Sequence, residues 1–314
     1  MIEVKNLTKR YGQNLALDRV SFKIEEGTIV GFLGPNGAGK STAMNIITGY
    51  LSATSGEVTV SGKNTLEEPG EVKKMIGYLP ELPPLYMDMT VKEYLYFMYE
   101  LKKAKLPREQ HIQEICRLVK IENVFNRLIA NLSKGYKQRV GLAQALVGSP
   151  DVVIMDEPTV GLDPKQIIEI RKLISGLGQN HTVVLSSHIL HEVADVCDRV
   201  VIINKGRIVA QDTLANLTQG IGEAIRLTVR VVGPEKPVQR LLHDVPGVKY
   251  VEALGSKELG SMDYVVESDS KTDVRRPMVN AILSAGYSLL MLKPMDVTLE
   301  DIFLQLTSED KGGI

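Results

Sequence analysis

A glycine-rich segment at residues 34–41 constrains this 314-residue chain more than any other feature of its sequence. It reads Gly-Pro-Asn-Gly-Ala-Gly-Lys-Ser and fits the phosphate-binding pattern G-x-x-x-x-G-K-[S/T] at every fixed position. Residues 28–33 before it form an apolar run typical of a buried strand, and residues 41–49 after it carry apolar positions at helical spacing. This context predicts a nucleoside triphosphate as ligand; a glycine-rich turn that binds nothing is the alternative.

The residue types of this loop explain the expected binding. Glycines let backbone N–H groups approach phosphates without a Cβ in the way, and the start of the helix adds partial positive charge. We expect Lys40 to reach the β- and γ-phosphates and the Ser41 hydroxyl to ligate Mg²⁺. The predicted nucleotide-binding residues of the loop are Gly34, Pro35, Asn36, Gly37, Ala38, Gly39, Lys40, Ser41 and Thr42.

Composition and charge limit the class of protein. The formal net charge of −1 gives no basic excess that would indicate a nucleic-acid partner, and no apolar run reaches the ~18 residues of a membrane span. The N-terminal residues 1–6 lack the apolar region of a secretory signal, so we expect the chain to stay in the cytoplasm. Cys116 and Cys197 have no metal-ligand spacing and are interpreted as two buried, reduced thiols.

A second apolar run, residues 152–157, ends in two carboxylates. Hydrolysis requires a metal ligand and a group that activates water, and these two carboxylates can supply both. In an open parallel sheet, ligands gather at the carboxyl ends of strands, where Asp156 and Glu157 are expected to lie. Asp156 suits a role directed at Mg²⁺. Glu157 points the other way by the period-two rule and suits the orientation and polarisation of the attacking water. A strand that merely ends in solvated acids is the alternative.

A third strand-like run, residues 182–188, ends in His188 at the same predicted edge of the sheet. Its placement makes His188 a candidate γ-phosphate sensor and catalytic residue, although a histidine at a strand end is more often structural. The remaining histidines are interpreted as ordinary surface or helix residues; they are His111, His181, His191 and His243.

Two domains are expected from the order of the predicted elements. Residues 1–217 alternate strand-like and helical runs, as in an α/β P-loop domain with a mainly parallel sheet, and residues 82–147 are interpreted as an inserted helical subdomain. Residues 218–223 are small and polar and indicate a linker. Residues 224–314 then follow the β-α-β-β-α-β order of a small α+β ferredoxin-like domain. Its strands are expected at 225–232, 248–254, 264–267 and 287–292, its helices at 237–244 and 273–285, and a closing helix at 299–306.

Residues 91–101 carry a helical apolar face within the predicted helical subdomain. The face consists of Val91, Tyr94, Leu95, Met98 and Leu101. We interpret it as a core stripe; in the alternative interpretation, Tyr96 and Tyr99 help to form a surface for a partner.

With these residues in place, the chain resembles the nucleotide-binding subunit of ABC transporters. Residues 132–139, Leu-Ser-Lys-Gly-Tyr-Lys-Gln-Arg, are similar to the LSGGQ signature of that family, which no other P-loop class carries. Residues 161–163 match its D-loop, and residues 76–81 stand at its Q-loop. The resemblance gives Tyr11 the role of the aromatic that stacks on adenine and His188 that of the switch histidine. It covers residues 1–217, with seven motifs in one order.

The resemblance implies a function that involves two further proteins. ATP and Mg²⁺ bound to one subunit would be covered by Ser133 and Gly135 of a second ATP-binding subunit, and Glu157 would hydrolyse the ATP to reopen the pair. This cycle would drive an integral membrane permease, which would hold the chain at the inner face of the cell membrane. Two alternatives stay open: an ABC-type ATPase that drives a non-transport membrane or protein complex, and a regulatory nucleotide-binding protein that barely hydrolyses.

Two departures from the family pattern matter. The signature has Lys134 and Tyr136 where the family has glycine and glutamine, so Ser133 and Gly135 remain to face phosphate. The Q-loop position is Glu81 rather than glutamine. A carboxylate can still ligate Mg²⁺, but it repels a γ-phosphate unless metal or a proton offsets the charge, so we expect weaker or more pH-sensitive Mg²⁺ coupling.

The C-terminal domain resembles the extension found on ATP-binding subunits of bacterial drug, sodium and gliding-type exporters, chiefly at residues 295–306. This resemblance implies export, and a dimer-supporting or regulatory module without chemistry of its own. The acids at 296–300 are equally typical of a plain helix N-terminus.

Overall fold

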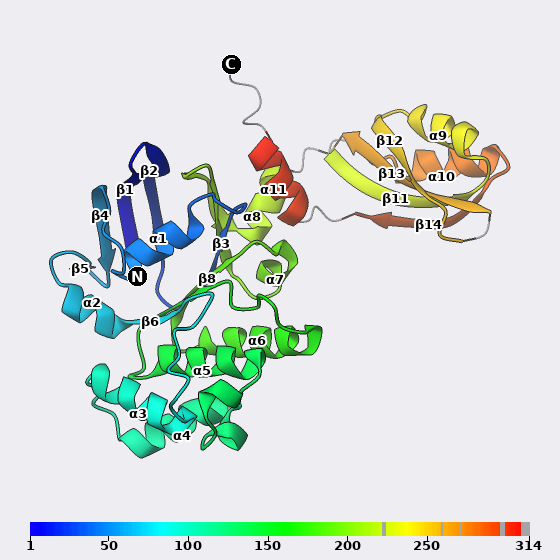
Figure 1. Cartoon of the computed structure of the whole chain (residues 1–314). Helices are drawn as coiled ribbons and strands as arrows, with labels where there is room; N and C mark the ends of the chain where they lie inside the picture. Colours follow the sequence, from blue (N-terminus) through cyan, green and yellow to red (C-terminus); the bar gives the residue numbers. More distant parts are fainter. Residues whose placement is uncertain (222–223, 259, 270–271, 296–298, 309–314) are drawn as a thin grey trace. The chain divides into compact units, whose positions relative to one another are not determined.

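The computed structural model describes residues 1–221, 224–258, 260–269, 272–295 and 299–308 (Figure 1). The chain forms two compact units. The first comprises Met1–Leu214 together with the segment that begins at Leu306, and the second comprises Ala215–Gln305. None of the described helices combines the length and apolar character that a bilayer-spanning segment needs.

The first unit is built around a six-stranded sheet in the order β10-β9-β3-β8-β7-β6. The five strands from β9 to β6 are parallel, and only β10 pairs in the antiparallel sense. The sheet confirms the expected mainly parallel α/β fold. Its strands are β3 (Ile29–Leu33), β6 (Ile76–Leu79), β7 (Val152–Asp156), β8 (Thr182–Ser187), β9 (Arg199–Asn204) and β10 (Arg207–Thr213). Every residue of β3, β7 and β8 is buried, as the continuous apolar runs predict.

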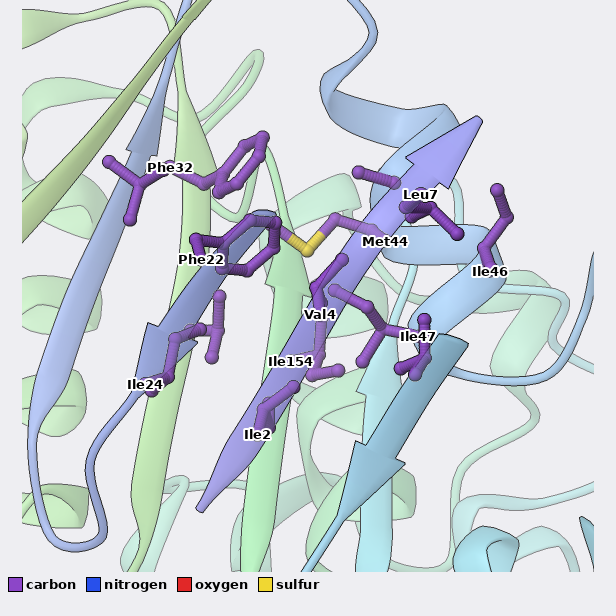
Figure 2. Close-up of a cluster of buried hydrophobic side chains, with 14 of the residues drawn as sticks. Ile2, Val4, Leu7, Phe22, Ile24, Phe32, Met44, Ile46, Ile47 and Ile154 are labelled. Atoms are coloured by element: carbon purple, nitrogen blue, oxygen red, sulfur yellow. The ribbon is translucent and has the colours of Figure 1, made fainter. Parts of the chain in front are cut away.

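A second, antiparallel sheet in the order β2-β1-β4-β5 was not expected from the sequence. Its strands are β1 (Ile2–Tyr11), β2 (Asn14–Ile24), β4 (Ser55–Val60) and β5 (Lys63–Asn64). The apolar side chains of this sheet pack with those of α1 (Lys40–Ile47) and of the parallel sheet in one buried cluster (Figure 2). Phe22 and Phe32 join the two sheets with ring centroids 5.3 Å apart. This core fixes the end of β3 and the start of α1, between which the glycine-rich loop lies.

The segment at 82–147 is largely helical, as expected. It contains α3 (Val91–Leu101), α4 (Arg108–Leu118), the short helices η1 (Glu122–Val124) and η2 (Ile129–Asn131), and α5 (Lys134–Leu146). The capping box that Thr90 and Glu93 form explains why α3 begins where it does. The other helices of this unit are α2 (Pro69–Met75), α6 (Pro164–Leu177) and α7 (Leu190–Ala194).

The predicted core stripe of α3 is correct in part. Val91, Tyr94 and Leu95 are buried, but the Leu101 side chain is 62% exposed at the last residue of the helix. Tyr99 takes its place in the core and donates a hydrogen bond to the Leu106 carbonyl oxygen. The next segment therefore packs against Tyr99, so this tyrosine is unavailable to a partner surface.

The second unit has the predicted β-α-β-β-α-β order. Its elements are β11 (Ala224–Val232), α9 (Glu235–His243), β12 (Val248–Gly255), β13 (Ser261–Asp269), α10 (Arg275–Ser284) and β14 (Ser288–Pro294). The strands form an antiparallel sheet in the order β12-β13-β11-β14, and α9 and α10 cover one face of it (Figure 1). The core between helices and sheet includes Val229, Tyr264 and Met278. The closing helix α11 spans Leu299–Ser308.

The linker predicted at residues 218–223 is wrong over its first four residues, because helix α8 (Leu214–Ile221) continues through them. Leu214, Leu217 and Ile221 recur at helical spacing, and this periodicity outweighs the small polar residues between them. Residues 222–223 of that prediction lie outside the described residues.

Both cysteines are buried and free, as expected. Burial raises the pKa of the Cys116 thiol to about 11 and also raises that of Cys197, so both stay protonated at neutral pH. Neither thiol is suited to chemistry in this fold.

Candidate functional site

The glycine-rich loop connects the end of β3 to the start of α1, as the sequence predicts. Gly37 and Gly39 have φ of 79° and 109°, a backbone conformation that glycine adopts far more readily than other residues. A Cβ added to Gly34 would collide with the Ile203 carbonyl oxygen, whereas nothing lies within 4 Å of the same position on Gly37. The backbone at Gly37 is therefore open to a ligand, while Gly34 permits the close approach of β9.

Lys40 extends from the first residue of α1 back over the loop. Its side chain is buried, and Nζ donates hydrogen bonds to the carbonyl oxygens of Gly34 at 2.7 Å and Pro35 at 3.3 Å. Burial lowers the pKa of this ammonium, and the negative charges of Glu157 and Asp156 offset part of that effect. The loop thus holds a desolvated cation beside open backbone N–H groups, which is a suitable receptor for phosphate.

Two carboxylates follow one another at the end of β7. Asp156 is buried and accepts a hydrogen bond from the Ser186 hydroxyl on β8. The Glu157 amide donates to that same Ser186 Oγ at 3.1 Å, and Glu157 has φ of 48°, a left-handed conformation uncommon for a residue with a side chain. Glu157 Oε1 lies 4.0 Å from Lys40 Nζ. The backbone here is strained in a way that often accompanies functional positions.

His188 follows β8 directly and meets Glu157. Its Nδ1 lies 2.9 Å from Glu157 Oε2, and its side chain is 45% exposed whereas that of Glu157 is 10% exposed. The two residues leave neighbouring parallel strands at the same edge of the sheet. One carboxylate is therefore shared between a buried lysine and a more exposed histidine.

These groups line one cavity of about 570 Å³, here called the nucleotide cavity. It gathers most of the predicted site residues: Tyr11, Asn36, Gly37, Gly39, Lys40, Ser41, Thr42, Glu81, Glu157 and His188. Gly34, Pro35 and Ala38 belong to the loop without lining the cavity. Sequence reasoning missed Asn14, Leu15, Ala16 and Val160 in its wall. The pairing of Tyr11 with Asn14 across the β1–β2 turn explains three of these, because the turn carries residues 14–16 to the wall beside Tyr11.

A second cavity of about 780 Å³, here called the lateral cavity, shares Ser41 and Glu81 with the nucleotide cavity and adds Asp156. All three predicted metal ligands thus line the lateral cavity, and two of them, Ser41 and Glu81, also line the nucleotide cavity. Within the described parts of the chain, no group of three or more His, Cys, Asp or Glu side chains is placed to hold an ion alone. One hydroxyl and two carboxylates fit Mg²⁺, which prefers oxygen ligands and completes its shell with water and substrate phosphates.

The signature segment lies at the start of α5, away from the nucleotide cavity. Ser133 is the N-cap of α5 and accepts a hydrogen bond from the Tyr136 amide, and Gly135 packs against the Gln166 side chain. The Lys134 side chain contacts Gly161 in the D-loop, and Asn123 Nδ2 donates to Tyr136 Oη at 2.8 Å. Neither Ser133 nor Gly135 is among the described residues that line the nucleotide cavity of its own chain.

Comparison with known proteins gives a consistent result. Residues 17–160 match the family described as ABC transporter. The chain is 36% identical over 213 residues to the bacitracin transport ATP-binding protein BcrA of Bacillus licheniformis. The matched region covers 67% of this chain and 69% of BcrA. It is 31% identical to the linearmycin resistance ATP-binding protein LnrL of Bacillus subtilis (strain 168), with 98% of each chain covered.

A solved structure resembles the first unit. The dimeric structure of MJ0796, a bacterial ABC transporter cassette, is 30% identical with a TM-score of 0.63 and covers 68% of this chain and 99% of that chain. The same cassette is also known in a post-hydrolysis state bound to ADP and Pi.

Proposed function

The chain belongs to the ATP-binding subunits of ABC transporters and is an ATP hydrolase, and from this premise we propose that it pairs with a second ATP-binding subunit to drive a separate membrane permease. The observation that carries the pairing is the position of the signature. Ser133 and Gly135 lie outside the nucleotide cavity that Lys40 and Glu157 line in the same chain. A second copy turned head to tail would supply them to the exposed phosphates of the nucleotide.

We propose the following roles within one half of the dimer. Lys40 leaves the carbonyl oxygens of Gly34 and Pro35 to bind the β- and γ-phosphates. Mg²⁺, when bound, would neutralise developing phosphate charge, with Ser41, Asp156 and Glu81 as its protein ligands. Tyr11, half-exposed at the mouth of the cavity, stacks on the adenine ring.

The attacking water is assigned to Glu157. Its carboxylate lies in the same cavity as the loop and is fixed from two sides by Lys40 and His188. Glu157 orients and polarises the water, and His188 holds the carboxylate and senses the γ-phosphate. Closure around ATP and reopening after hydrolysis then move the permease.

Export is the direction we propose, and the cytoplasmic face of the membrane is the proposed location. The support is the likeness, over 98% of this chain, to LnrL, whose name states linearmycin resistance, and the likeness to BcrA, whose name states bacitracin transport. The second unit is proposed to support dimerisation or regulation without chemistry of its own. An ABC-type ATPase that acts on a non-transport complex remains the alternative, and co-purification of a polytopic permease separates the two.

The molar mass of purified Glu157→Gln tests the pairing. By size-exclusion chromatography with light scattering, we expect a monomer without nucleotide and a dimer with ATP and Mg²⁺, because blocked hydrolysis traps the closed state. Addition of Ser133→Arg to this variant should abolish the dimer while ATP binding persists. A monomer under both conditions would contradict the head-to-tail arrangement for the isolated chain.

A further inference from the structure

One end of the nucleotide cavity is formed by the hairpin of β1 and β2. The hairpin supplies Tyr11, Asn14, Leu15 and Ala16, whereas the phosphate loop and the start of α1 supply the residues around Lys40. With the phosphates at the loop and adenine stacked on Tyr11, the hairpin surrounds the base. A tyrosine that stacks on a base keeps its hydroxyl in a plane parallel to that base, and Leu15 and Ala16 have apolar side chains. Of the four hairpin residues, Asn14 is therefore the one whose side chain can form hydrogen bonds with the edge of the base.

The register of the hairpin holds Asn14 beside Tyr11. The two residues lie directly opposite each other, and the chain reverses between them within two residues, Gly12 and Gln13. Directly opposite residues of an antiparallel pair point to the same face of the sheet, with Cβ atoms roughly 5 Å apart. The edge of a purine stacked on the Tyr11 ring therefore comes within reach of the Asn14 side chain.

Lys9 contacts the Tyr11 ring from outside the cavity. Its Nζ lies 5.2 Å from the centroid of the ring and donates a hydrogen bond to the Ser52 carbonyl oxygen at 2.8 Å. Lys9 is not among the described residues that line the nucleotide cavity. The ammonium therefore leaves the cavity side of the ring to the base. Because Lys9 is itself anchored, it restricts the ring before the base arrives, which reduces the conformational entropy lost on binding.

The side-chain amide of Asn14 can distinguish one purine from another. It is exposed and forms no hydrogen bond with the other described residues, so Oδ1 is free to accept and Nδ2 to donate. Adenine has a donor, its 6-amino group, beside an acceptor, N7, and an asparagine amide matches this pair with two hydrogen bonds. Guanine and hypoxanthine have two acceptors there, O6 and N7. Whichever way the amide is turned, Oδ1 would then face a lone pair.

We propose that Asn14 selects the base of the nucleotide: Oδ1 accepts a hydrogen bond from the 6-amino group of adenine, and Nδ2 donates one to N7. This inference rests on the proposed function for the stacking of adenine on Tyr11. It adds a residue that makes the site prefer ATP to GTP and to inosine triphosphate (ITP). The phosphate loop contacts the part that all three nucleotides share, so the discrimination between them depends on the hairpin.

Isothermal titration calorimetry of the purified chain with four nucleotides tests the base contacts. Mg²⁺ is omitted so that hydrolysis does not proceed. We expect the wild type to bind ATP roughly 10-fold more tightly than GTP or ITP, and roughly 5-fold more tightly than 7-deaza-ATP, which has a carbon in place of N7. Equal affinity for ATP and ITP, or for ATP and 7-deaza-ATP, overturns the inference and leaves the proposed function standing. Failure of all four nucleotides to bind contradicts the proposed function itself.

Two neighbouring variants assign the preference to Asn14. In Asn14→Ala we expect the affinity for ATP to fall roughly 10-fold and that for GTP to stay nearly constant, so that the ratio of the two affinities approaches one. A general distortion of the site would instead weaken both nucleotides together. Gln13→Ala is the matched control, because it removes an amide at an exposed position that is not part of the cavity lining, and it should keep the wild-type ratio. A wild-type ratio in Asn14→Ala would overturn the inference.

Discussion

Glu157 and His188 are 31 residues apart in sequence, yet Nδ1 of the histidine lies 2.9 Å from Oε2 of the glutamate. The parallel register of β7 and β8 accounts for this contact. Asp156 pairs with Ser186, and both strands then end at the carboxyl edge of the sheet. The carboxylate that we assign to the attacking water is thus positioned by the neighbouring strand and by Lys40 on its other side.

Replacement of His188 should separate binding from hydrolysis. In His188→Ala we expect kcat for ATP to fall about 100-fold while the Kd for ATP hardly changes, because the histidine positions Glu157 and the phosphate loop stays intact. Steady-state ATPase assays with fluorescence titration measure both quantities. His243→Ala, at an exposed position in the second unit, is the control. Unchanged kcat in His188→Ala would assign the histidine a structural role.

The two ends of the phosphate loop should respond differently to an added methyl group. In Gly37→Ala the new Cβ meets no protein atom, so it blocks only the approach of phosphate. The left-handed backbone at this position lowers the free energy of unfolding of the variant by about 1–2 kcal/mol. Gly34→Ala meets the Ile203 carbonyl oxygen and should destabilise the first unit more.

Thermal unfolding and ATP titration distinguish the two variants. We expect Gly37→Ala to remain folded with ATP affinity at least about tenfold weaker, and Gly34→Ala to unfold at lower temperature. Wild-type affinity in a folded Gly37→Ala would remove this glycine from the phosphate site.

Glu81→Gln introduces the amide that the family resemblance implies for this position. Because the carboxylate repels a γ-phosphate unless Mg²⁺ or a proton offsets its charge, the wild type should need more Mg²⁺ and show a steeper pH profile than the variant. ATPase activity measured against Mg²⁺ concentration at several pH values checks this. Identical profiles would show that Glu81 stays away from the metal and the phosphate.

Much of the site could be predicted because its residues sit in local patterns. The order of strand, glycine loop and helix places Lys40 and Ser41, and apolar runs that end in polar residues place Glu157 and His188 on one edge of the sheet. Residues that reach the site through the antiparallel sheet could not be predicted in this way. Asn14 lines the nucleotide cavity only because a tight turn follows Tyr11, and Tyr11 itself was assigned by resemblance.

Lys102 illustrates the same limit more sharply. From the sequence, a lysine at a helix end is expected at the surface, and the neighbouring Leu101 is expected in the core. The structure instead exposes Leu101 and buries much of Lys102. The carbonyl oxygens that accept hydrogen bonds from Lys102 lie at the end of α5, more than 40 residues away in sequence. Helical periodicity cannot encode such a contact.

Removal of the second unit tests the proposed division of labour. Truncation after Gly220 removes β11 to β14 with their helices and retains the parallel sheet, the phosphate loop and the nucleotide cavity. We therefore expect the shortened chain to bind ATP with unchanged affinity, measured by fluorescence titration. Loss of binding in a shortened chain that still shows a cooperative thermal transition would refute the separation of the two units.

The isolated chain should become more stable, relative to Lys102→Met, as the pH rises above 8. The pKa of Lys102 is about 8 in the folded chain, whereas an unfolded lysine titrates near 10.4. At pH values between these two pKa values the unfolded state binds more protons than the folded state, so the wild-type free energy of unfolding increases with pH. At pH values below both, Lys102 is charged in both states and the folded state bears the full cost of burying that charge. The gain is on the order of 3 kcal/mol.

Urea unfolding of both proteins at several pH values between 7 and 10 measures this difference. Lys105→Met provides the baseline, because an exposed lysine should give a difference from wild type that does not vary with pH. A flat difference for Lys102→Met as well would mean that water hydrates its ammonium in the lateral cavity.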